Sequence, residues 1–308
     1  MYKTSLPNLK HKPFGGAWCI HDKEQAQYRD QKIVEWTKQK NLNHNEVKNS
    51  FFNKLKYWMF STHTIQGCEK FTECCYTHGT TETFSQFYIR YRTKRLRLFR
   101  ADYFYHEMMQ KLWYQNNFEY IDNSNPIQSG DVVVLSVPFS NTGNIPQNLE
   151  QLLSQCDQKD VPVLLDLAYL NISENLDFNL EHPCIQYITT SLSKTFPLEH
   201  NRIGIRLQRK KDKFEDQLYV INEDNYNYIP LMNCWIATEM LKEFPADYIV
   251  KKYKGLQLEY CERLNLEPSS CVIFGLDYNN SYPEYKRSVE PNRLCFSRVW
   301  DGRMPSLD

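Results

Sequence analysis

Glycine is scarce in this chain, and neither sign of charge is in excess. Only 10 of the 308 residues are glycine, which excludes collagen-like and glycine-rich low-complexity chains. Because so few glycines occur, each is expected where a side chain would be in the way. Lysine plus arginine and aspartate plus glutamate both total 37, so the net charge is zero. This balance argues against a protein that coats nucleic acid or an anionic membrane, and we expect neither partner.

Metal-site spacings and long apolar runs are also missing. The ten cysteines are scattered, without a CxxC pair, an HExxH motif or a Cys/His spacing of the zinc type, so no metal is expected. The longest apolar run, 132–137, has the length of a strand rather than of a membrane span. Residues 1–18 contain no apolar segment of the signal-peptide kind. These absences predict a cytoplasmic protein with free thiols.

Strand-like and helix-like segments alternate in the middle of the chain. The runs 131–137 and 161–165 are predominantly apolar and rich in β-branched residues, which is typical of strands covered on both faces. Further strands are expected at 72–77, 96–99, 118–121, 185–192 and 203–207, and helices at 80–91, 105–114 and 145–156. The alternation predicts an α/β fold with a mostly parallel sheet between layers of helices.

The two ends of the chain follow a different pattern. Helices are expected at 21–36, 45–58, 224–244 and 246–263, and short strands at 272–274 and 293–297. We therefore predict a large α/β domain over residues 60–215. Residues 1–59 and 216–308 are expected to combine into a smaller α+β domain.

Three charged residues follow the predicted strands, at the edge where open α/β sheets bind ligands. Asp166 comes directly after an apolar strand, where an ionised carboxylate is costly unless it meets a cation. A lysine at a buried strand end, such as Lys194, loses its proton readily and becomes nucleophilic. Arg202 precedes Ile203 and Gly204, a setting that suits a phosphate. Taken singly, each is more typical of a solvated or salt-bridged side chain, so the argument depends on their combination.

In combination, these residues resemble a known motif set. Ser191-Leu-Ser-Lys194, with Arg202 eight residues after the lysine and then Ile-Gly, is similar to the cofactor-lysine segment of class I/II aminotransferases. These are fold-type-I enzymes that use pyridoxal 5′-phosphate. Asp166-Leu-Ala-Tyr169 matches their Asp-x-Ala-Tyr, and the turn 79–82 resembles their Gly-Ser-Thr-Glu. The strand 292–297 resembles the one that carries their substrate-binding arginine. The resemblance spans about residues 72–298, in the same order.

The resemblance implies a role for each residue. Lys194 would form a Schiff base with the cofactor and move the α-proton of the substrate. Asp166 would pair with the pyridine nitrogen, Tyr169 would contact the ring oxygen, and Tyr103 would stack on the ring. Arg293 would bind the α-carboxylate of an amino acid. The phosphate would be held by Gly79, Thr80, Thr81, Ser191 and Arg202.

Two segments depart from the family pattern or leave their role open. The family's Asn-Pro-x-Asn-Pro-Thr-Gly is replaced by Val137-Pro-Phe-Ser-Asn-Thr-Gly143. Ser140 therefore stands where an asparagine would contact the ring oxygen, and Asn141 comes one step later, so either could serve. The glycine pair in the segment 14–18 could let an N-terminal arm fold over the site, or simply form a turn.

Three functions are compatible with this pattern. The first is an aminotransferase acting on an α-amino acid and a 2-oxo acid. The second keeps the cofactor but performs elimination, replacement or cyclisation at the β or γ carbon. The third is a non-catalytic binding protein on the same fold. The resemblance also implies a homodimer with the active site at the subunit interface. The basic run 90–97 is expected to be structural rather than to bind nucleic acid.

Overall fold

The central element is a seven-stranded sheet in the order β2-β9-β8-β6-β5-β3-β4. The computed structural model describes residues 9–114, 117–122, 124–210 and 228–305. The strands from β8 to β4 are mutually parallel, whereas β9 is antiparallel to both of its neighbours. The strand bounds are β2 (Glu73–Thr77), β3 (Arg95–Leu98), β4 (Phe118–Tyr120), β5 (Asp131–Ser136), β6 (Val163–Asp166), β8 (Ile185–Ser191) and β9 (Gly204–Gln208). This confirms the predicted mostly parallel α/β sheet.

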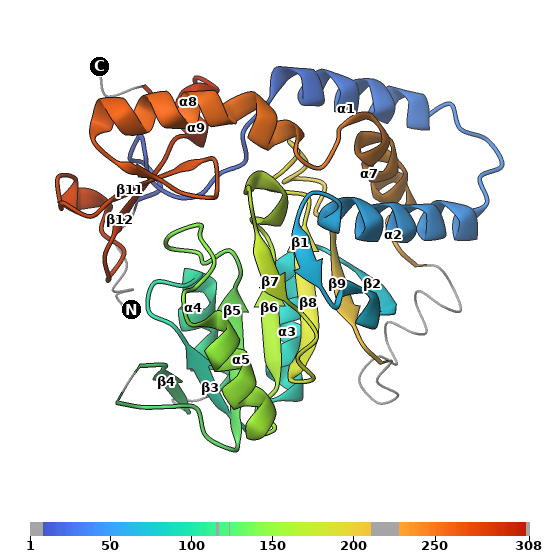
Figure 1. The fold of residues 1–308 in the computed structure, drawn as a ribbon. Coiled ribbons are helices and arrows are strands. Elements are labelled where there is room, and N and C mark those ends of the chain that lie inside the picture. The colour runs from blue at the N-terminus through green and yellow to red at the C-terminus, as the bar shows by residue number, and fades with distance from the viewer. Residues whose placement is uncertain (1–8, 115–116, 123, 211–227, 306–308) are drawn as a thin grey trace.

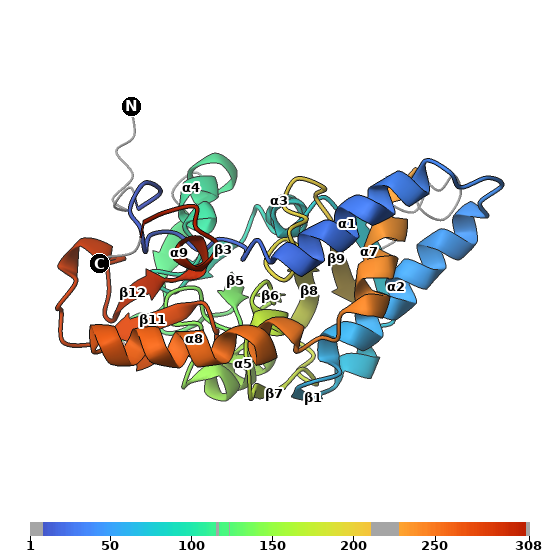
Figure 2. The same ribbon diagram turned by 90° about the horizontal axis from the view of Figure 1, so that it is seen from above.

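Helices cover both faces of this sheet (Figure 1, Figure 2). Val132 and Val134 of β5 join a core cluster with α3 (Thr80–Arg90), on the face that also carries α4 (Phe104–Trp113). Val133 and Leu135 point to the opposite face and join the largest core cluster. That cluster includes side chains of α5 (Leu149–Gln158), α2 (His44–Phe60) and α7 (Leu231–Glu243). Because both faces of β5 are covered, side chains on both faces enter a core, and most residues of this strand are apolar.

A smaller antiparallel sheet lies near the C-terminus. It has the order β10 (Glu267–Pro268), β11 (Phe274–Asp277) and β12 (Asn292–Cys295), and α8 (Tyr248–Leu264) packs beside it. Phe14 of the N-terminal segment packs among Leu294 and Phe296, so both chain ends contribute to this unit. The short helix α9 (Ser297–Trp300) follows. The domain boundaries at residues 60 and 215 stay a prediction, although α2 and α7 share their core with the large sheet.

The segment 9–22, which we call the N-terminal arm, directly precedes α1 (Lys23–Trp36). It contacts the C-terminal part of the chain. The Asp22 carboxylate lies 2.6 Å from the Lys252 ammonium and accepts a hydrogen bond from Tyr253 at 2.8 Å. Arg303 donates to the carbonyl oxygen of Cys19 at 2.5 Å. These contacts fix the arm against α8 and the residues after α9.

The basic run 90–97 serves the sheet. Arg97 is fully buried, and its guanidinium lies 2.7 Å from the Asp131 carboxylate. Arg95 reaches the same carboxylate at 2.6 Å. A buried arginine must be neutralised, and Asp131 does this for Arg97. The ion pairs of Asp131 with Arg95 and Arg97 hold the start of β5 against β3.

Several elements differ from the prediction. Helix α5 begins at Leu149 rather than at residue 145, because Pro146 lies in the loop before it. The strand β11 begins two residues later than predicted, and the predicted strand 293–297 ends at Cys295. The short parallel pair β1 (Thr64–Gln66) and β7 (Asp177–Asn179) was not predicted, since three residues give no readable alternation. Residues 224–227 of the predicted helix lie outside the described part. None of the helices in the described ranges is long and apolar enough to span a membrane.

Candidate active site

The carboxyl ends of the parallel strands bring the predicted residues to one edge of the sheet. Ser136 at the end of β5 pairs with Asp166 at the end of β6, which pairs with Thr189 of β8. Ser191, the last residue of β8, pairs with Gly204, the first residue of β9. Gly204 pairs in turn with Thr77. The pyridine-binding candidate Asp166 and the phosphate-binding candidate Ser191 therefore lie at the same edge of the sheet, with Ser191 two residues beyond Asp166's partner on β8.

The start of α3 has the features of an anion site. Gly79 precedes the helix with φ +94°, and no side chain caps the free N–H groups of the first turn, where Thr80 and Thr81 lie partly exposed. Arg202 is exposed and donates to the carbonyl oxygen of His78 at 2.7 Å. A Cβ atom on Gly79 would lie 2.5 Å from the Arg202 guanidinium. A helix N-terminus beside an exposed arginine is a ready site for a phosphate.

Ser191 lies beside this helix start but already has a partner. Its Oγ is 2.9 Å from the Ser193 Oγ and accepts the Ser193 N–H at 3.2 Å. The two hydroxyls close the turn that follows β8. They hold the backbone in the shape that leads to Lys194.

Asp166 is a buried carboxylate without a cation. Its Oδ1 accepts the Ala168 N–H at 3.1 Å, and no lysine or arginine of the described residues forms an ion pair with it. Burial, together with the negative charge of Asp102, raises the pKa of Asp166 to about 7. A carboxylate in this setting favours a ligand that brings a positive charge.

Lys194 lies in the loop after β8, facing the N-terminal arm. Its Nζ donates a hydrogen bond to the carbonyl oxygen of Ala17. Burial lowers the pKa of Lys194, and the positive charge of Arg293 acts in the same direction. A lysine with a lowered pKa holds more of its amine in the neutral, nucleophilic form.

Arg293 of β12 is buried, and its charge acts on Lys194. One Nη donates to the carbonyl oxygen of Ser140 and the other donates to that of Gly16 at 2.6 Å. The guanidinium lies over the Phe274 ring, 4.3 Å from its centroid. Its Nε is buried and has no partner in the described part of the chain. The arginine is thus fixed in place and still has a hydrogen bond to give.

A second buried arginine, Arg287, was missed in the sequence. It donates to the same Ser140 oxygen as Arg293, at 3.0 Å. Its loop between β11 and β12 shows no helical or strand periodicity, and a lone arginine beside a lysine reads as solvent-exposed. Only the folded structure brings it to the site.

The two tyrosine candidates lie near the carboxylate and the arginines. Tyr103 precedes α4, and burial followed by the charge of Asp166 raises its pKa to about 12. Its ring is stacked on Tyr105 with the centroids 6.0 Å apart. Burial also raises the pKa of Tyr169, while Arg293 and Arg287 act against this rise. Both phenols therefore stay neutral at the edge of the site.

Ser140 and Asn141 differ in what they leave unsatisfied. The Ser140 carbonyl is taken by the two arginines. The Asn141 Nδ2 donates to the Pro291 carbonyl at 3.1 Å, and its Oδ1 is buried without a partner among the described residues. The buried Thr77 Oγ1 also has no partner among the described residues. Unpartnered buried polar atoms at this edge are the mark of a site that takes a polar ligand.

Gly204 has no room for a side chain, which gives a direct test of the sheet edge. A Cβ there would lie 2.8 Å from the Thr190 carbonyl oxygen and 3.0 Å from the Gly79 Cα. Because both neighbours are backbone, we expect Gly204→Ala to lower the free energy of unfolding by about 2 kcal/mol and to weaken cofactor binding. Urea unfolding and cofactor titration measure the two effects.

Gly255→Ala on α8 is the matched control, since its Cβ would meet nothing within 4 Å. It is expected to stabilise the protein slightly through helix propensity. A Gly204→Ala protein as stable as the wild type would show that the edge is not packed as described.

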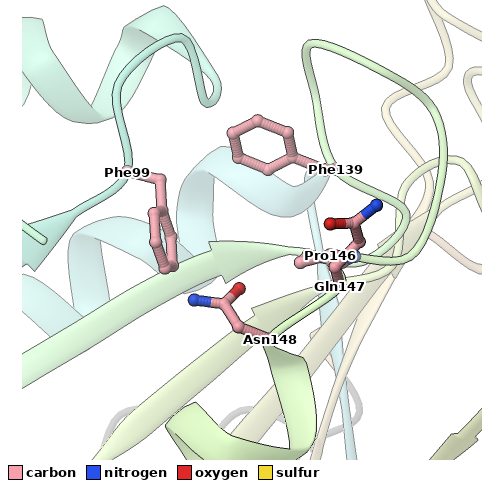
Figure 3. Close-up of a pocket in the computed structure, with 5 residues that line it drawn as sticks. All are labelled: Phe99, Phe139, Pro146, Gln147 and Asn148. Carbon is pink, nitrogen blue, oxygen red and sulfur yellow. The ribbon is translucent and has the colours of Figure 1, made fainter. Parts of the chain in front are cut away.

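A separate hollow lies beside the loop after β5 (Figure 3). It has a volume of about 310 Å³ and is lined by Phe99, Phe139, Pro146, Gln147 and Asn148. None of the predicted site residues lines it, and no charged side chain belongs to its wall. In the described part of the chain, no cluster of histidine, cysteine, aspartate or glutamate could hold a metal ion.

Comparison with known proteins identifies the fold and the family. The family model for aminotransferase class I and II matches residues 97–255, slightly more than half of the chain. The chain belongs to this family. No curated protein matches the sequence. The enzymes of the family depend on pyridoxal 5′-phosphate, which confirms the predicted cofactor and enzyme class.

Solved aminotransferase structures have the same architecture. An aspartate aminotransferase mutant of Thermus thermophilus is 13% identical, with a TM-score of 0.61 over 95% of this chain and 88% of that one. The histidinol-phosphate aminotransferase of Clostridium acetobutylicum is 15% identical, with a TM-score of 0.60 over 94% and 98%. The L-threonine-O-3-phosphate decarboxylase of Porphyromonas gingivalis is 14% identical, with a TM-score of 0.59 over 90% and 91%. At these identities the likeness concerns the fold.

The residues present fit the cofactor of the aminotransferase family. Asp166 is a carboxylate in need of a cation, as a pyridine nitrogen would supply when protonated. The uncapped start of α3 beside Arg202 suits a phosphate.

Proposed function

We propose that this protein transfers the amino group of an α-amino acid to a 2-oxo acid, with pyridoxal 5′-phosphate attached to Lys194. One observation carries the proposal: a partly buried amine with a lowered pKa, a buried carboxylate without a cation and a buried guanidinium lie around one site. These are Lys194, Asp166 and Arg293. The alignment of strand ends supports their joint use.

Each residue then has a defined task. When bound, the cofactor supplies an electron-withdrawing ring that stabilises negative charge at the substrate α-carbon. Arg293 binds the α-carboxylate through its guanidinium and thereby orients the α-hydrogen. The neutral Lys194 Nζ accepts the α-proton and later returns it, as its lowered pKa allows. Asp166, in its ionised form, would hold the ring nitrogen and favour its protonated state.

The remaining contacts hold the cofactor. We assign its phosphate to Arg202, Ser191 and the backbone of Gly79, Thr80 and Thr81. Tyr169 would contact the ring oxygen, and Tyr103 would stack on the ring. Either the Ser140 hydroxyl or the Asn141 Nδ2 could donate to the ring oxygen, and the Asn141 Nδ2 would have to leave the Pro291 carbonyl to do so.

A cytoplasmic homodimer completes the proposal. Members of the family are typically dimeric. An exposed apolar stripe on α4 supports an interface close to Tyr103: Phe104 and Met108 are each 43% exposed and Leu112 is 68% exposed. The positions i, i+4 and i+8 place these side chains on one face of the helix. All ten cysteines are free thiols, which suits the cytoplasm.

A panel of amino acids tests the reaction. With the holoenzyme and no acceptor, a transaminase releases one 2-oxo acid per active site and stops, because the amino group stays on the enzyme. A second 2-oxo acid then restores the starting absorbance and yields a new amino acid. Continuous release of ammonia, or of a group from the β or γ carbon, would instead establish elimination, replacement or cyclisation. Mass spectrometry of the products separates these outcomes.

A further inference from the structure

We propose that Arg287 forms a second anion-binding subsite beside Arg293, so that the preferred substrate is an amino acid whose side chain ends in a carboxylate or a phosphate. The inference rests on the proposed function, because Arg293 must hold the α-carboxylate for Arg287 to be left for the side chain.

The two guanidiniums converge on one backbone oxygen. Arg287 donates to the Ser140 carbonyl at 3.0 Å, and Arg293 donates to the same oxygen. Arg287 also reaches the Asp102 carbonyl at 3.5 Å. Both arginines are more than nine-tenths buried, with exposures of 7% and 3%. Backbone carbonyls fix their positions without neutralising their charges.

Within the described part of the chain, neither arginine has a carboxylate partner within 4.0 Å. The nearest acids are engaged elsewhere. The two oxygens of Asp102 accept the backbone N–H groups of Tyr103 and Ser136, at 2.7 and 3.0 Å. Glu107 accepts the Tyr120 hydroxyl. Burial and the charge of Arg293 lower the pKa of Arg287 to about 9. Two buried like charges that share an acceptor are costly unless anions join them.

The charges in the site determine how many anions it needs. The phosphate of the cofactor belongs with Arg202, at the start of α3. An α-carboxylate satisfies Arg293, whose Nε still has no partner in the described residues. Arg287 is then the remaining cation, and it lies on the substrate side, close enough to Tyr169 for each to shift the pKa of the other. A second anion on the substrate would neutralise it.

The guanidinium binds a carboxylate or a phosphate in the same forked geometry. Amino acids with a side-chain carboxylate and amino acids with a side-chain phosphate are therefore both tested. With the holoenzyme, the ratio of kcat/KM for glutamate over glutamine, and for phosphoserine over serine, measures the preference for an anionic side chain. We expect at least one ratio to exceed 100 in the wild type.

Arg287→Gln is the decisive variant. It is expected to lower kcat/KM for the preferred anionic donor roughly 100-fold and to change the neutral partner less than about 3-fold. Arg287→Lys should restore part of the loss, since it retains the charge but not the fork. Arg92→Gln is the matched control, because Arg92 is exposed in the turn after α3 and its loss removes the same charge. The control should leave both ratios unchanged.

A binding measurement supplies a readout apart from turnover. Calorimetry should show that the holoenzyme binds glutarate or O-phosphoserine at least 10-fold more tightly than valerate, and that Arg287→Gln removes this difference. If Arg287→Gln does not fold, the wild-type ratios and the Arg287→Lys variant decide the question.

Two results would overturn the subsite. One is a wild type that uses neutral and anionic donors equally well. The other is an Arg287→Gln variant that loses all donors alike, which would mean that Arg287 helps Arg293 to hold the α-carboxylate. A different result would contradict the proposed function. If no donor yields a 2-oxo acid while anion binding still depends on Arg287, the subsite stands and the amino transfer does not.

Discussion

Lys194→Ala is expected to lower turnover by at least about 10⁴-fold, because in the proposed mechanism this one side chain both attaches the cofactor and moves the α-proton. Folding should be retained, since the Lys194 side chain makes one hydrogen bond, to the Ala17 carbonyl. Turnover with the preferred amino donor measures the loss. Borohydride reduction followed by peptide mapping should fix the cofactor to the wild-type peptide containing Lys194 and leave the variant unlabelled.

Lys251→Ala is the control for the loss of a lysine. Lys251 lies on α8, 72% exposed, and pairs with Asp247. It should retain full turnover and the wild-type label. Added methylamine should restore a fraction of the activity of Lys194→Ala, because a small free amine can enter the space left by the side chain. A Lys194→Ala enzyme with more than about a tenth of normal turnover would contradict the assigned proton transfer.

Asp166→Asn is expected to have two opposite effects, one on function and one on stability. Loss of the carboxylate should lower turnover by about 10² to 10³-fold, the usual effect of removing a preorganised charge from a reacting group. The apoprotein should become more stable at alkaline pH. The reason is that burial and Asp102 raise the pKa of Asp166 from 3.8 to about 7, so the folded protein pays to ionise it.

The pH dependence follows from the direction of this shift. The folded protein binds the Asp166 proton more tightly than the unfolded chain does, so the favourable contribution is complete below about pH 4 and lost as the pH rises through about 7. The difference between the pKa values of Asp166 in the unfolded and folded protein corresponds to at most about 4 kcal/mol of stability. Asparagine carries no such proton, and the stability advantage of the variant should appear between pH 5 and 8 and then level off.

Urea unfolding of the apoproteins from pH 5 to 9 measures this difference. Asp177→Asn serves as the control, because Asp177 is exposed on β7. Its stability should follow the wild type at every pH. A constant difference between Asp166→Asn and wild type across this range would contradict the raised pKa. Saturating cofactor should reverse the order of stability at pH 8, since it supplies the missing cation.

The sequence contained enough information to locate the sheet edge but not the whole site. Asp166 and Ser191 end apolar strands, and the strand ends of a parallel sheet meet at one edge, so their place at a common edge follows from pattern alone. The importance of Gly204 is predicted by the scarcity of glycine in the chain and by the residues beside it. The structure shows the backbone contacts that require a glycine there. Arg287 could not be found, because its loop has no periodicity and its burial depends on a partner 147 residues away, Ser140.

Main-chain groups account for much of what remained unpredicted. The carbonyl oxygens of Gly16, Ala17 and Ser140 hold Lys194 and the two arginines. Every residue has such an oxygen, so no side-chain pattern can reveal which ones will face the site. The arm 14–18 was expected either to fold over the site or to form a turn. The segment accepts hydrogen bonds from Lys194 and Arg293, so it lies against both of these candidate site residues.

The ties between the arm and the chain end also set an order of events during synthesis. Phe14 accepts its hydrogen bond from Cys295, and Asp22 meets Lys252, so residues made early must wait for residues made more than two hundred positions later. The large sheet, with Lys194 and Asp166, can form while the chain is still on the ribosome. Arg293, the proposed substrate-binding residue, joins the site only when β12 emerges, so on this proposal catalytic competence is among the last properties that a growing chain acquires.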